Sequence, residues 1–248
     1  MAGAMNAIWN VTRRELSGYF STPVAWVFIV IFLVMAGVFT FYIGSFYERG
    51  IADLAPFFQF HPWLYLFLVP AIGMRLWAEE RRSGTVELLL TLPITTWQAV
   101  LGKFLAAWLF VGLALFLTFP VWLTVNYLGK PDNGVILAGY IGSWLMAGGF
   151  LAIASCMSAL TRNQVVAFIL SVVVCFGFLL SGLPMVMNLF TGWAPQVLLD
   201  AIANFSFLAH FADISKGVID LRDLVYFGLV MMLWLVATTI VLEMKKAD

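Results

Sequence analysis

Charged side chains are scarce in this sequence. Only 10% of the 248 residues are Asp, Glu, Lys or Arg, and 63% are hydrophobic, whereas a soluble domain carries about 25% charged residues. This shortage is explained if lipid rather than water covers most of the protein surface. Acidic and basic residues balance at 13 each, so the net charge gives no reason to expect a nucleic-acid partner.

Cysteine, histidine and catalytic motifs are scarce as well. Cys156 and Cys175 fall in long apolar runs, where a thiol is usually a small packing residue, so neither a disulfide nor a metal site is indicated. His61 and His210 are expected as polar residues near the outer membrane interface. The sequence contains no Walker-type phosphate loop and no HExxH, CxxC or GxSxG motif. We therefore predict no catalytic residue, no metal site and no cofactor in this chain.

Long uncharged runs predict six membrane-spanning helices, because each run reaches about the 18 residues that a spanning helix requires. The predicted fold is an all-α polytopic membrane protein in which residues 1–248 form a single transmembrane domain. The predicted spans cover residues 24–47, 57–79, 96–128, 134–160, 164–184 and 222–243. Small residues recur in the fourth span and predict close helix packing, most simply within one subunit.

The basic residues predict the orientation of these spans. With the N-terminus in the cytoplasm, nine of the Lys and Arg residues fall on the cytoplasmic side and four on the outer side. This bias follows the positive-inside rule. Six spans then return the C-terminus to the cytoplasm.

Residues 4–21 precede the first span and have a helical periodicity of their own. Met5, Trp9 and Leu16 lie on the apolar side, and Arg13 lies opposite. The pattern predicts an interfacial elbow helix in the inner membrane surface, with its arginines near anionic lipid. A plain cytoplasmic extension of the first span is the alternative.

The stretch 79–93, between the second and third spans, carries five charged residues and must therefore lie in water. A charged helix end is followed by a break at Gly84, an amphipathic segment and a stop at Pro93. This order predicts a short helix over 84–93 that docks onto a soluble partner. The residues assigned to the docking surface are Glu79, Glu80, Arg81, Arg82, Gly84, Thr85, Glu87, Leu88, Leu89 and Pro93.

Local signals flank this docking element on both sides. Arg75 and Glu79 are four residues apart and can pair along a helix. Thr95 and Gln98 form a capping box that starts the third span. Lys103 lies two turns into that span, from where its ammonium group is expected to snorkel to the cytoplasmic interface.

Residues 186–216 are apolar but interrupted by Gly and Pro. They predict an outer re-entrant hairpin of two short helices, since broken structure at membrane depth persists only when it packs against protein or lines a cavity. The hairpin is expected to roof a pathway, and a passive outer cap is the alternative. The residues singled out in it are Pro195, Asp200, His210 and Asp213.

The centres of the predicted spans carry no charge. Ion-coupled transporters place Asp, Glu or Lys there, so this pattern disfavours a secondary transporter or a channel. A pathway with apolar and aromatic walls suits a hydrophobic or amphipathic substrate. The energy for transport must then enter from outside the membrane domain.

The stretch from Glu79 to Ile94, followed by Gly102-Lys103, resembles the signature loop of ABC-2 type permeases of ATP-binding cassette (ABC) transporters, the type V exporter-like class. Residues 210–223 are similar to the gliding-motility-permease branch of that family. The resemblance covers the whole chain. It implies that 84–93 is a coupling helix that sits in a cleft of an ATPase.

The resemblance also implies partners and a location. Two ABC ATP-binding subunits would carry ATP and Mg²⁺, and the permease would form a homodimer or heterodimer in the bacterial inner membrane, with both termini cytoplasmic. A periplasmic or membrane accessory protein is a further possible partner. Two functions remain open at this point: export of a hydrophobic or amphipathic substrate, or transmission of ATP-driven motion to a partner without transport. A secondary transporter is the third and least favoured reading.

Overall fold

The computed structural model describes residues 2–85, 94–181, 183–190, 195–196 and 202–245. Helix accounts for 83% of the structure, and the described ranges contain no strand, which confirms the predicted all-α class. The helices are α1 (Ala2–Phe20), α2 (Pro23–Gly37), the π-helix η1 (Val38–Ile43), α3 (Ala55–Gln59), α4 (His61–Gly73), α5 (Arg75–Ser83), α7 (Thr96–Phe116), α8 (Phe119–Leu128), α9 (Asn133–Leu160), α10 (Gln164–Leu180), α11 (Pro184–Phe190), α13 (Phe207–Ser215) and α14 (Leu221–Met244).

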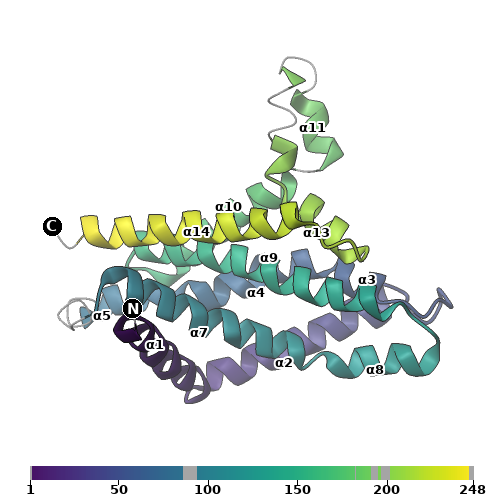
Figure 1. The fold of residues 1–248 in the computed structure, drawn as a ribbon, viewed down its shortest axis with the longest axis horizontal. Helices are drawn as coiled ribbons and strands as arrows, with labels where there is room; N and C mark the ends of the chain where they lie inside the picture. Colours follow the sequence, from purple (N-terminus) through teal and green to yellow (C-terminus); the bar gives the residue numbers. More distant parts are fainter. Residues whose placement is uncertain (1, 86–93, 182, 191–194, 197–201, 246–248) are drawn as a thin grey trace.

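The long helices run side by side along one axis of the molecule (Figure 1). At one end, α1 crosses the bundle obliquely, and α5 and both chain termini lie at this same end. The helices α3, α8 and α13 lie toward the opposite end, and α11 projects away from the bundle. The stretch predicted to dock a soluble partner therefore begins at the end of the molecule that also holds both termini.

Within the described ranges, four helical stretches are long and apolar enough to cross a membrane: Pro23–Ile43, Thr96–Leu128, Asn133–Leu160 and Leu221–Met244. Their exposed side chains are mostly apolar, including Val27, Val30 and Val34 on α2. Such a surface is stable only against lipid or another protein. The protein is therefore a multi-pass membrane protein.

The predicted span 96–128 is divided in the structure. The helix α7 ends at Phe116, and α8 follows after a short break. Pro120 in the first turn of α8 has no N–H to donate to the carbonyl oxygen of Phe116, so the helical ladder cannot run through this point. Within the break, the hydroxyl of Thr118 donates to the carbonyl oxygen of Leu115 at 2.6 Å.

Helix α9 lies at the centre of the bundle, and its small residues let the other helices approach it. A Cβ added at Gly142 would lie 2.7 Å from Ile214 of α13, and one at Gly148 would lie 2.6 Å from the sulfur of Met231 of α14. Both distances are too short for a side chain. The small residues of this helix therefore pack within the subunit, as the sequence favours.

Two tryptophans join α9 to α7. The rings of Trp108 and Trp144 stack with their centroids 4.1 Å apart. The indole N–H of Trp108 donates to the carbonyl oxygen of Trp144 at 2.9 Å, and that of Trp144 donates to the carbonyl oxygen of Trp108 at 3.2 Å. Both partly buried indole donors are thus satisfied, as is usual for aromatic side chains with a polar atom.

Five of the described helices, α7, α9, α10, α13 and α14, begin at a side-chain cap that the sequence encodes locally. Thr95 and Gln98 form the predicted capping box of α7. Asp132 accepts from the backbone N–H groups at the start of α9, and Asp220 does the same for α14. Each such cap contributes about 1 kcal/mol to helix stability.

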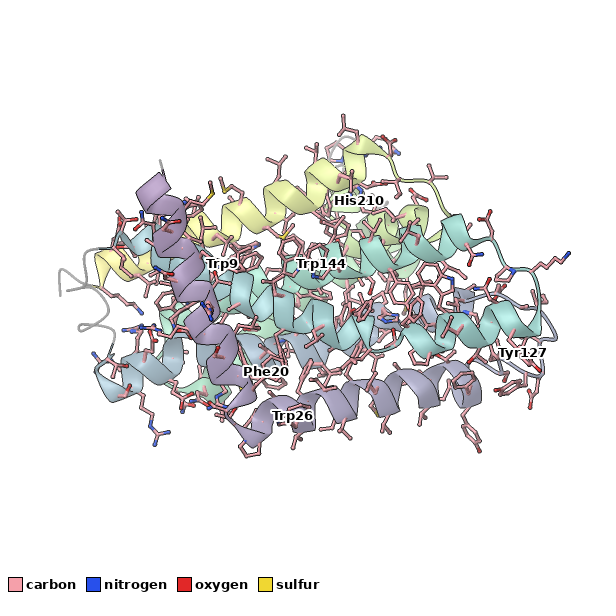
Figure 2. The ribbon with its side chains drawn as sticks, turned by 60° about the horizontal axis from the view of Figure 1, so that its bottom comes forward. Trp9, Phe20, Trp26, Tyr127, Trp144 and His210 are labelled. Atoms are coloured by element: carbon pink, nitrogen blue, oxygen red, sulfur yellow. The ribbon has the colours of Figure 1, made fainter. Side chains whose placement is uncertain are left out.

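Helix α1 packs against the first half of α7. Val11 is buried there, and the hydroxyl of Thr12 donates to the carbonyl oxygen of Gly102 at 3.1 Å. Met5 and Trp9, on the side expected to face lipid, are 71% and 60% exposed (Figure 2). Part of α1 is therefore fixed by protein contacts, whereas Met5 and Trp9 remain on the surface.

Candidate functional site

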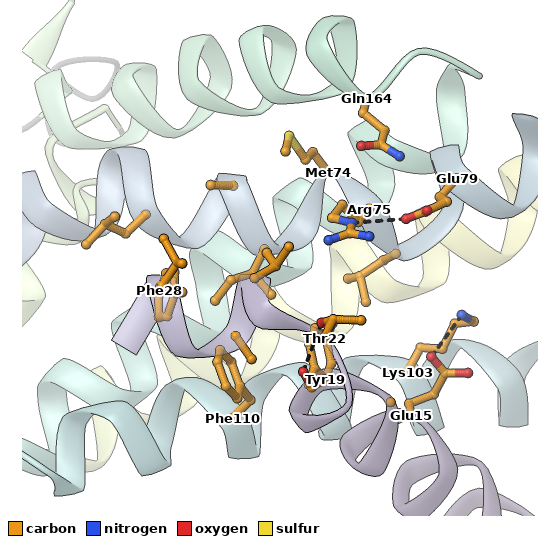
Figure 3. Close-up of a pocket in the computed structure, with 18 of the residues that line it drawn as sticks. Glu15, Tyr19, Thr22, Phe28, Met74, Arg75, Glu79, Lys103, Phe110 and Gln164 are labelled. Carbon is orange, nitrogen blue, oxygen red and sulfur yellow. Dashed lines mark hydrogen bonds and ion pairs between the residues drawn. The ribbon is translucent and has the colours of Figure 1, made fainter. Parts of the chain in front are cut away.

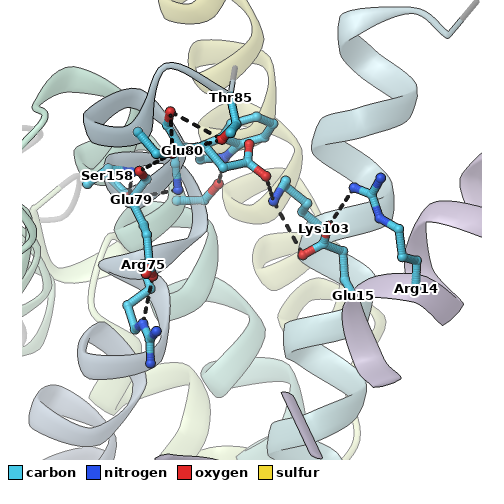
Figure 4. Close-up of polar contacts among 12 residues, drawn as sticks. Arg14, Glu15, Arg75, Glu79, Glu80, Thr85, Lys103 and Ser158 are labelled. Atoms are coloured by element: carbon cyan, nitrogen blue, oxygen red, sulfur yellow. Dashed lines mark hydrogen bonds and ion pairs between the residues drawn. The ribbon is translucent and has the colours of Figure 1, made fainter. Parts of the chain in front are cut away.

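The helix α5 carries the charged residues that precede the predicted docking element (Figure 4). Arg75 Nε donates to Glu79 Oε2 at 3.0 Å, which is the pairing that their spacing predicts. Gly84 ends the helix in the left-handed conformation, with φ of +74°, and its N–H donates to the carbonyl oxygen of Glu80. Glycine adopts this conformation without a steric cost, so the predicted helix break at this position is confirmed.

The side chain of Ser158, from α9, is inserted between α4 and α5. Its Oγ accepts from the backbone N–H groups of Trp77 and Ala78 at 3.1 and 3.0 Å and donates to the carbonyl oxygen of Met74 at 2.7 Å. In a regular α-helix the N–H of Ala78 would donate directly to the carbonyl oxygen of Met74. A side chain inserted in the hydrogen-bond ladder bends a helix, and Pro70, which lies within α4, interrupts the ladder a few residues earlier.

The C-terminal end of α9 is bound by two cations. Arg81 Nη1 donates to the carbonyl oxygen of Ala159 at 2.6 Å, and Lys245 Nζ donates to that of Leu160. The last carbonyl groups of a helix have no partner within it and carry partial negative charge. Both contacts therefore hold α5 and the end of α14 against α9.

Lys103 joins three helices at the same end of the bundle (Figure 4). Its Nζ lies 2.7 Å from Glu80 Oε1 of α5 and 3.3 Å from Glu15 Oε2 of α1. The ammonium also lies 5.3 Å from the ring centroid of Trp77, within the range of a cation–π contact. We name Lys103, Glu15 and Glu80 the lysine node.

The prediction that the ammonium of Lys103 snorkels to the interface is wrong. The residue is only 3% exposed, because α1 and α5 bring two carboxylates to it. A buried charge is tolerated when it is paired in this way. The helical spacing of α7 alone gives no sign of these partners.

Burial and ion pairing act in opposite directions on the carboxyl of Glu15. Burial by itself raises its pKa, but the neighbouring charges of Lys103 and Arg14 outweigh burial and hold the pKa below its ordinary value. Glu15 is therefore ionised near neutral pH. Within the lysine node, Glu15 therefore supplies a carboxylate that pairs with Lys103 under these conditions.

At the opposite end, His210 of α13 binds the first turn of α14. Its Nδ1 lies 2.6 Å from Asp223 Oδ1, and its Nε2 lies 3.0 Å from the carbonyl oxygen of Asn204. The ring of Tyr226 stacks on it with centroids 3.8 Å apart. His210 is only 6% exposed. The ring is therefore enclosed by α13 and α14, and the place of His210 near the outer interface stays a prediction.

His61 is enclosed as well. It is fully buried, and its Nδ1 lies 2.8 Å from the carbonyl oxygen of Phe57. The rings of Phe57 and Tyr65 contact it edge-on. The side chain therefore packs within the bundle, and its place near the outer interface stays a prediction.

The remaining predicted site residues fall into three groups. Arg82 and Thr85 are exposed at the end of α5, and Pro195 is exposed in the outer segment. Asp213 is exposed and lies 3.3 Å from Lys216 Nζ. The residues Glu87, Leu88, Leu89, Pro93 and Asp200 lie outside the described residues.

A cavity of about 480 Å³ lies beside the lysine node, between α1, α2, α4, α5, α7 and α10 (Figure 3). Glu15, Arg75, Glu79 and Gln164 lie toward one end of it, and the aromatic rings at the other end include Phe28. We name it the elbow cavity. Its volume falls in the range of about 300–1,000 Å³ that is typical of small-molecule sites.

Sequence reasoning missed the contacts that join separate helices. Ser158 lies 84 positions from Met74, and Lys103 lies 88 positions from Glu15. The one signal available was Lys103 itself, a charged residue among apolar neighbours. A buried cation requires a carboxylate partner, but the sequence does not say which of the 13 acidic residues supplies it.

The chain resembles known proteins along most of its length. A family model described as "ABC-2 family transporter protein" matches residues 9–243. The chain is 28% identical over 187 residues to a protein named probable ABC transporter permease protein NosY from Stutzerimonas stutzeri, covering 71% of this chain and 68% of that protein. A protein with the same name from Pseudomonas aeruginosa is 29% identical over 166 residues, covering 62% of this chain and 60% of that protein.

Proposed function

This chain belongs to the ABC-2 family of transporter proteins, and from that premise we propose that it couples ATP hydrolysis on partner subunits to export. It is a membrane permease subunit of an ABC transporter. In the proposed complex, two copies of the permease, or this chain and a related one, associate with two separate ATP-binding subunits. The exported substrate is hydrophobic or amphipathic.

Six spans are proposed for the subunit. The four long candidate spans are joined by α10, an apolar helix of 17 residues, and by α4 with α5. At 1.5 Å per residue, 17 residues reach about 25 Å, and a small adjustment of the bilayer or of the flanking residues accommodates such a helix. Six spans support the proposed orientation, because both termini then lie on one side, the cytoplasm.

The element 84–93 is proposed as the coupling helix that docks onto an ATP-binding subunit. The contacts of α5 support this role. Movement of a docked segment would reach α9 through Ser158 and Arg81, and α1 and α7 through the lysine node. The observation that carries the proposal is that one short charged helix makes polar contacts to α9 and α7 and is linked to α1 through Lys103.

The central test replaces Gly84 by proline. Proline fixes φ near −65° and has no N–H, so it cannot keep the φ of +74° or the bond to Glu80. A Cβ at this position meets no atom within 4 Å, so packing inside the bundle is not disturbed. The variant should insert normally but lose most of the ATPase stimulation that the permease gives its partner subunits.

Gly50 provides the matched control. It also has a positive φ, of +61°, with no atom within 4 Å of an added Cβ, and its N–H likewise donates to a backbone carbonyl, that of Tyr47. It lies in the connection before α3, toward the end of the molecule opposite α5 (Figure 1). The Gly50→Pro variant should keep ATPase stimulation.

The assay is ATP hydrolysis by the purified complex in proteoliposomes, with the amount of bound ATP-binding subunit measured in parallel. Equal stimulation by wild type, Gly84→Pro and Gly50→Pro would refute coupling through this element. A parallel Glu87→Lys variant reverses one charge in the proposed docking surface. It should reduce binding of the ATP-binding subunit.

A further inference from the structure

The elbow cavity has a polar end and an apolar end (Figure 3). Arg75, Glu79 and Gln164 lie at the polar end, beside the lysine node. Phe28 and Ile31 of α2 and Leu68 of α4 line the apolar part. A cavity of this form fits an amphipathic molecule, whose head and chain require different surroundings.

The charges at the polar end are not equally available to a ligand. In the lysine node, Lys103 is held by two carboxylates and its side chain is only 4% exposed. The side chains of Arg75 and Glu79 are 33% and 50% exposed. Arg75 and Glu79 are therefore the most accessible charges in the cavity lining, ahead of Glu15, whose side chain is 23% exposed.

The pair Arg75 and Glu79 presents both signs of charge to the cavity. Glu79 accepts a hydrogen bond from the Nε–H of Arg75, and neither terminal nitrogen of Arg75 has a protein partner among the described residues. Such a planar group binds phosphate through two parallel hydrogen bonds. The carboxylate of Glu79 accepts hydrogen bonds from an ammonium group. A head that carries phosphate and amine together complements the pair.

The apolar part of the cavity lies beside the lipid-facing surface of α2. Val24, Val27 and Ile31 line the cavity and are 51%, 55% and 44% exposed. An acyl chain can enter here from the bilayer without passing through water. Because lipid and the cavity wall are similarly apolar, the chain gains little by this transfer, so the head group must supply the selectivity.

We propose that the elbow cavity binds a phospholipid with a zwitterionic amine head from the leaflet on the α5 side, with its phosphate on Arg75 and its ammonium on Glu79. This inference rests on the proposed function, because it names the substrate class as such a lipid. The head then lies next to the lysine node, whose partners on α1 and α5 move with the proposed coupling helix. ATP-driven movement of α1 and α5 would therefore change the surroundings of the bound lipid head.

The test measures lipid retained by the purified permease. Nanodiscs containing equal amounts of phosphatidylethanolamine and phosphatidylglycerol supply the lipid, and mass spectrometry counts what remains after exchange into detergent. Wild type should retain phosphatidylethanolamine. Arg75→Gln should lower this retention about tenfold, as the loss of a charged hydrogen-bonding partner predicts.

Glu79→Gln should change the preference instead of abolishing binding. With the carboxylate removed and the guanidinium kept, the ratio of retained lipids should shift about tenfold toward the anionic phosphatidylglycerol. The matched controls are Arg49→Gln and Asp53→Asn. Their side chains form an exposed pair of the same spacing, 3.4 Å apart, outside the cavity lining, and both controls should retain lipid as wild type does.

Lipid retention that is the same in wild type, Arg75→Gln and Glu79→Gln would overturn the inference. So would cross-linking that shows a second copy of the chain filling the cavity, because no lipid could then enter. The measurement does not involve ATP. If Gly84→Pro loses ATPase stimulation as expected but no lipid is retained, this inference alone is rejected. If lipid is retained selectively but Gly84→Pro keeps its ATPase stimulation, the proposed function is rejected.

Discussion

Replacement of Lys103 by methionine should destabilise the protein more than any other single loss of a lysine charge. The substitution keeps a long side chain but removes the cation, so the carboxylates of Glu15 and Glu80 face each other at the edge of the bundle. One oxygen of Glu80 is already buried without a partner among the described residues. Removal of one member of a buried ion pair costs about 3–5 kcal/mol.

This loss converts into a measurable melting shift. For a chain of 150–250 residues, about 1 kcal/mol changes the melting temperature by roughly 2–4 °C. The melting temperature of Lys103→Met should therefore fall on the order of 10 °C. Thermal unfolding of the purified permease in detergent, followed by the loss of the monodisperse chromatographic peak, gives this value.

Lys216→Met is the matched control. Lys216 also pairs with a carboxylate, Asp213 at 3.3 Å, but its side chain is 71% exposed. Exposed ion pairs contribute about 0–1 kcal/mol, so this variant should melt close to wild type. Equal melting temperatures for Lys103→Met and Lys216→Met would refute the buried lysine node.

A rescue experiment separates lost charge balance from lost packing. Addition of Glu15→Gln and Glu80→Gln to Lys103→Met removes the uncompensated carboxylates. Replacement of all members of a buried ionic group is often close to neutral. The triple variant should therefore recover most of the melting temperature, and a failure to recover would assign the defect to packing.

Two further predictions concern packing and pH. Gly73→Ala should lower the free energy of unfolding by about 1–3 kcal/mol, because the added Cβ would lie 2.3 Å from the Cβ of Ala154. Gly37→Ala should raise the free energy of unfolding by about 0.5–1 kcal/mol, because no atom lies within 4 Å of the added Cβ. Chemical unfolding in mixed micelles measures both changes. The pKa of Glu15 is lower in the folded state than the ordinary 4.5, so its contribution to stability is present above pH 4.5 and is lost as pH falls through the folded-state pKa. Wild type should therefore lose stability below pH 4.5 more steeply than Glu15→Gln, and parallel pH profiles would contradict the shifted pKa.

Features that depend on neighbouring residues could be predicted from the sequence. The capping box of Thr95 and Gln98, the left-handed Gly84 and the pair of Arg75 with Glu79 all involve residues within four positions of one another. Helix geometry fixes such contacts before any tertiary packing exists. The long apolar helices follow in the same way from run length.

Features that join distant segments could not be predicted. Nothing near Ser158 in the sequence indicates that its hydroxyl enters the backbone of another helix. The burial of His61 and His210 follows from which helices pack against them. Tertiary contacts enclose both rings, whereas the place of both residues near the outer interface stays a prediction.

The sequence by itself determined that this chain is helical, lies in a membrane and interrupts its apolar runs with one short charged segment. These properties follow from hydrophobicity and from backbone rules that act within a few residues. Only the tertiary structure decided that Lys103 is buried, which carboxylates neutralise it and that a cavity with a polar and an apolar end lies beside it. The physical reason is that charge pairing and cavity shape depend on the packing of helices far apart in the chain, and the same helices packed differently would leave Lys103 in water.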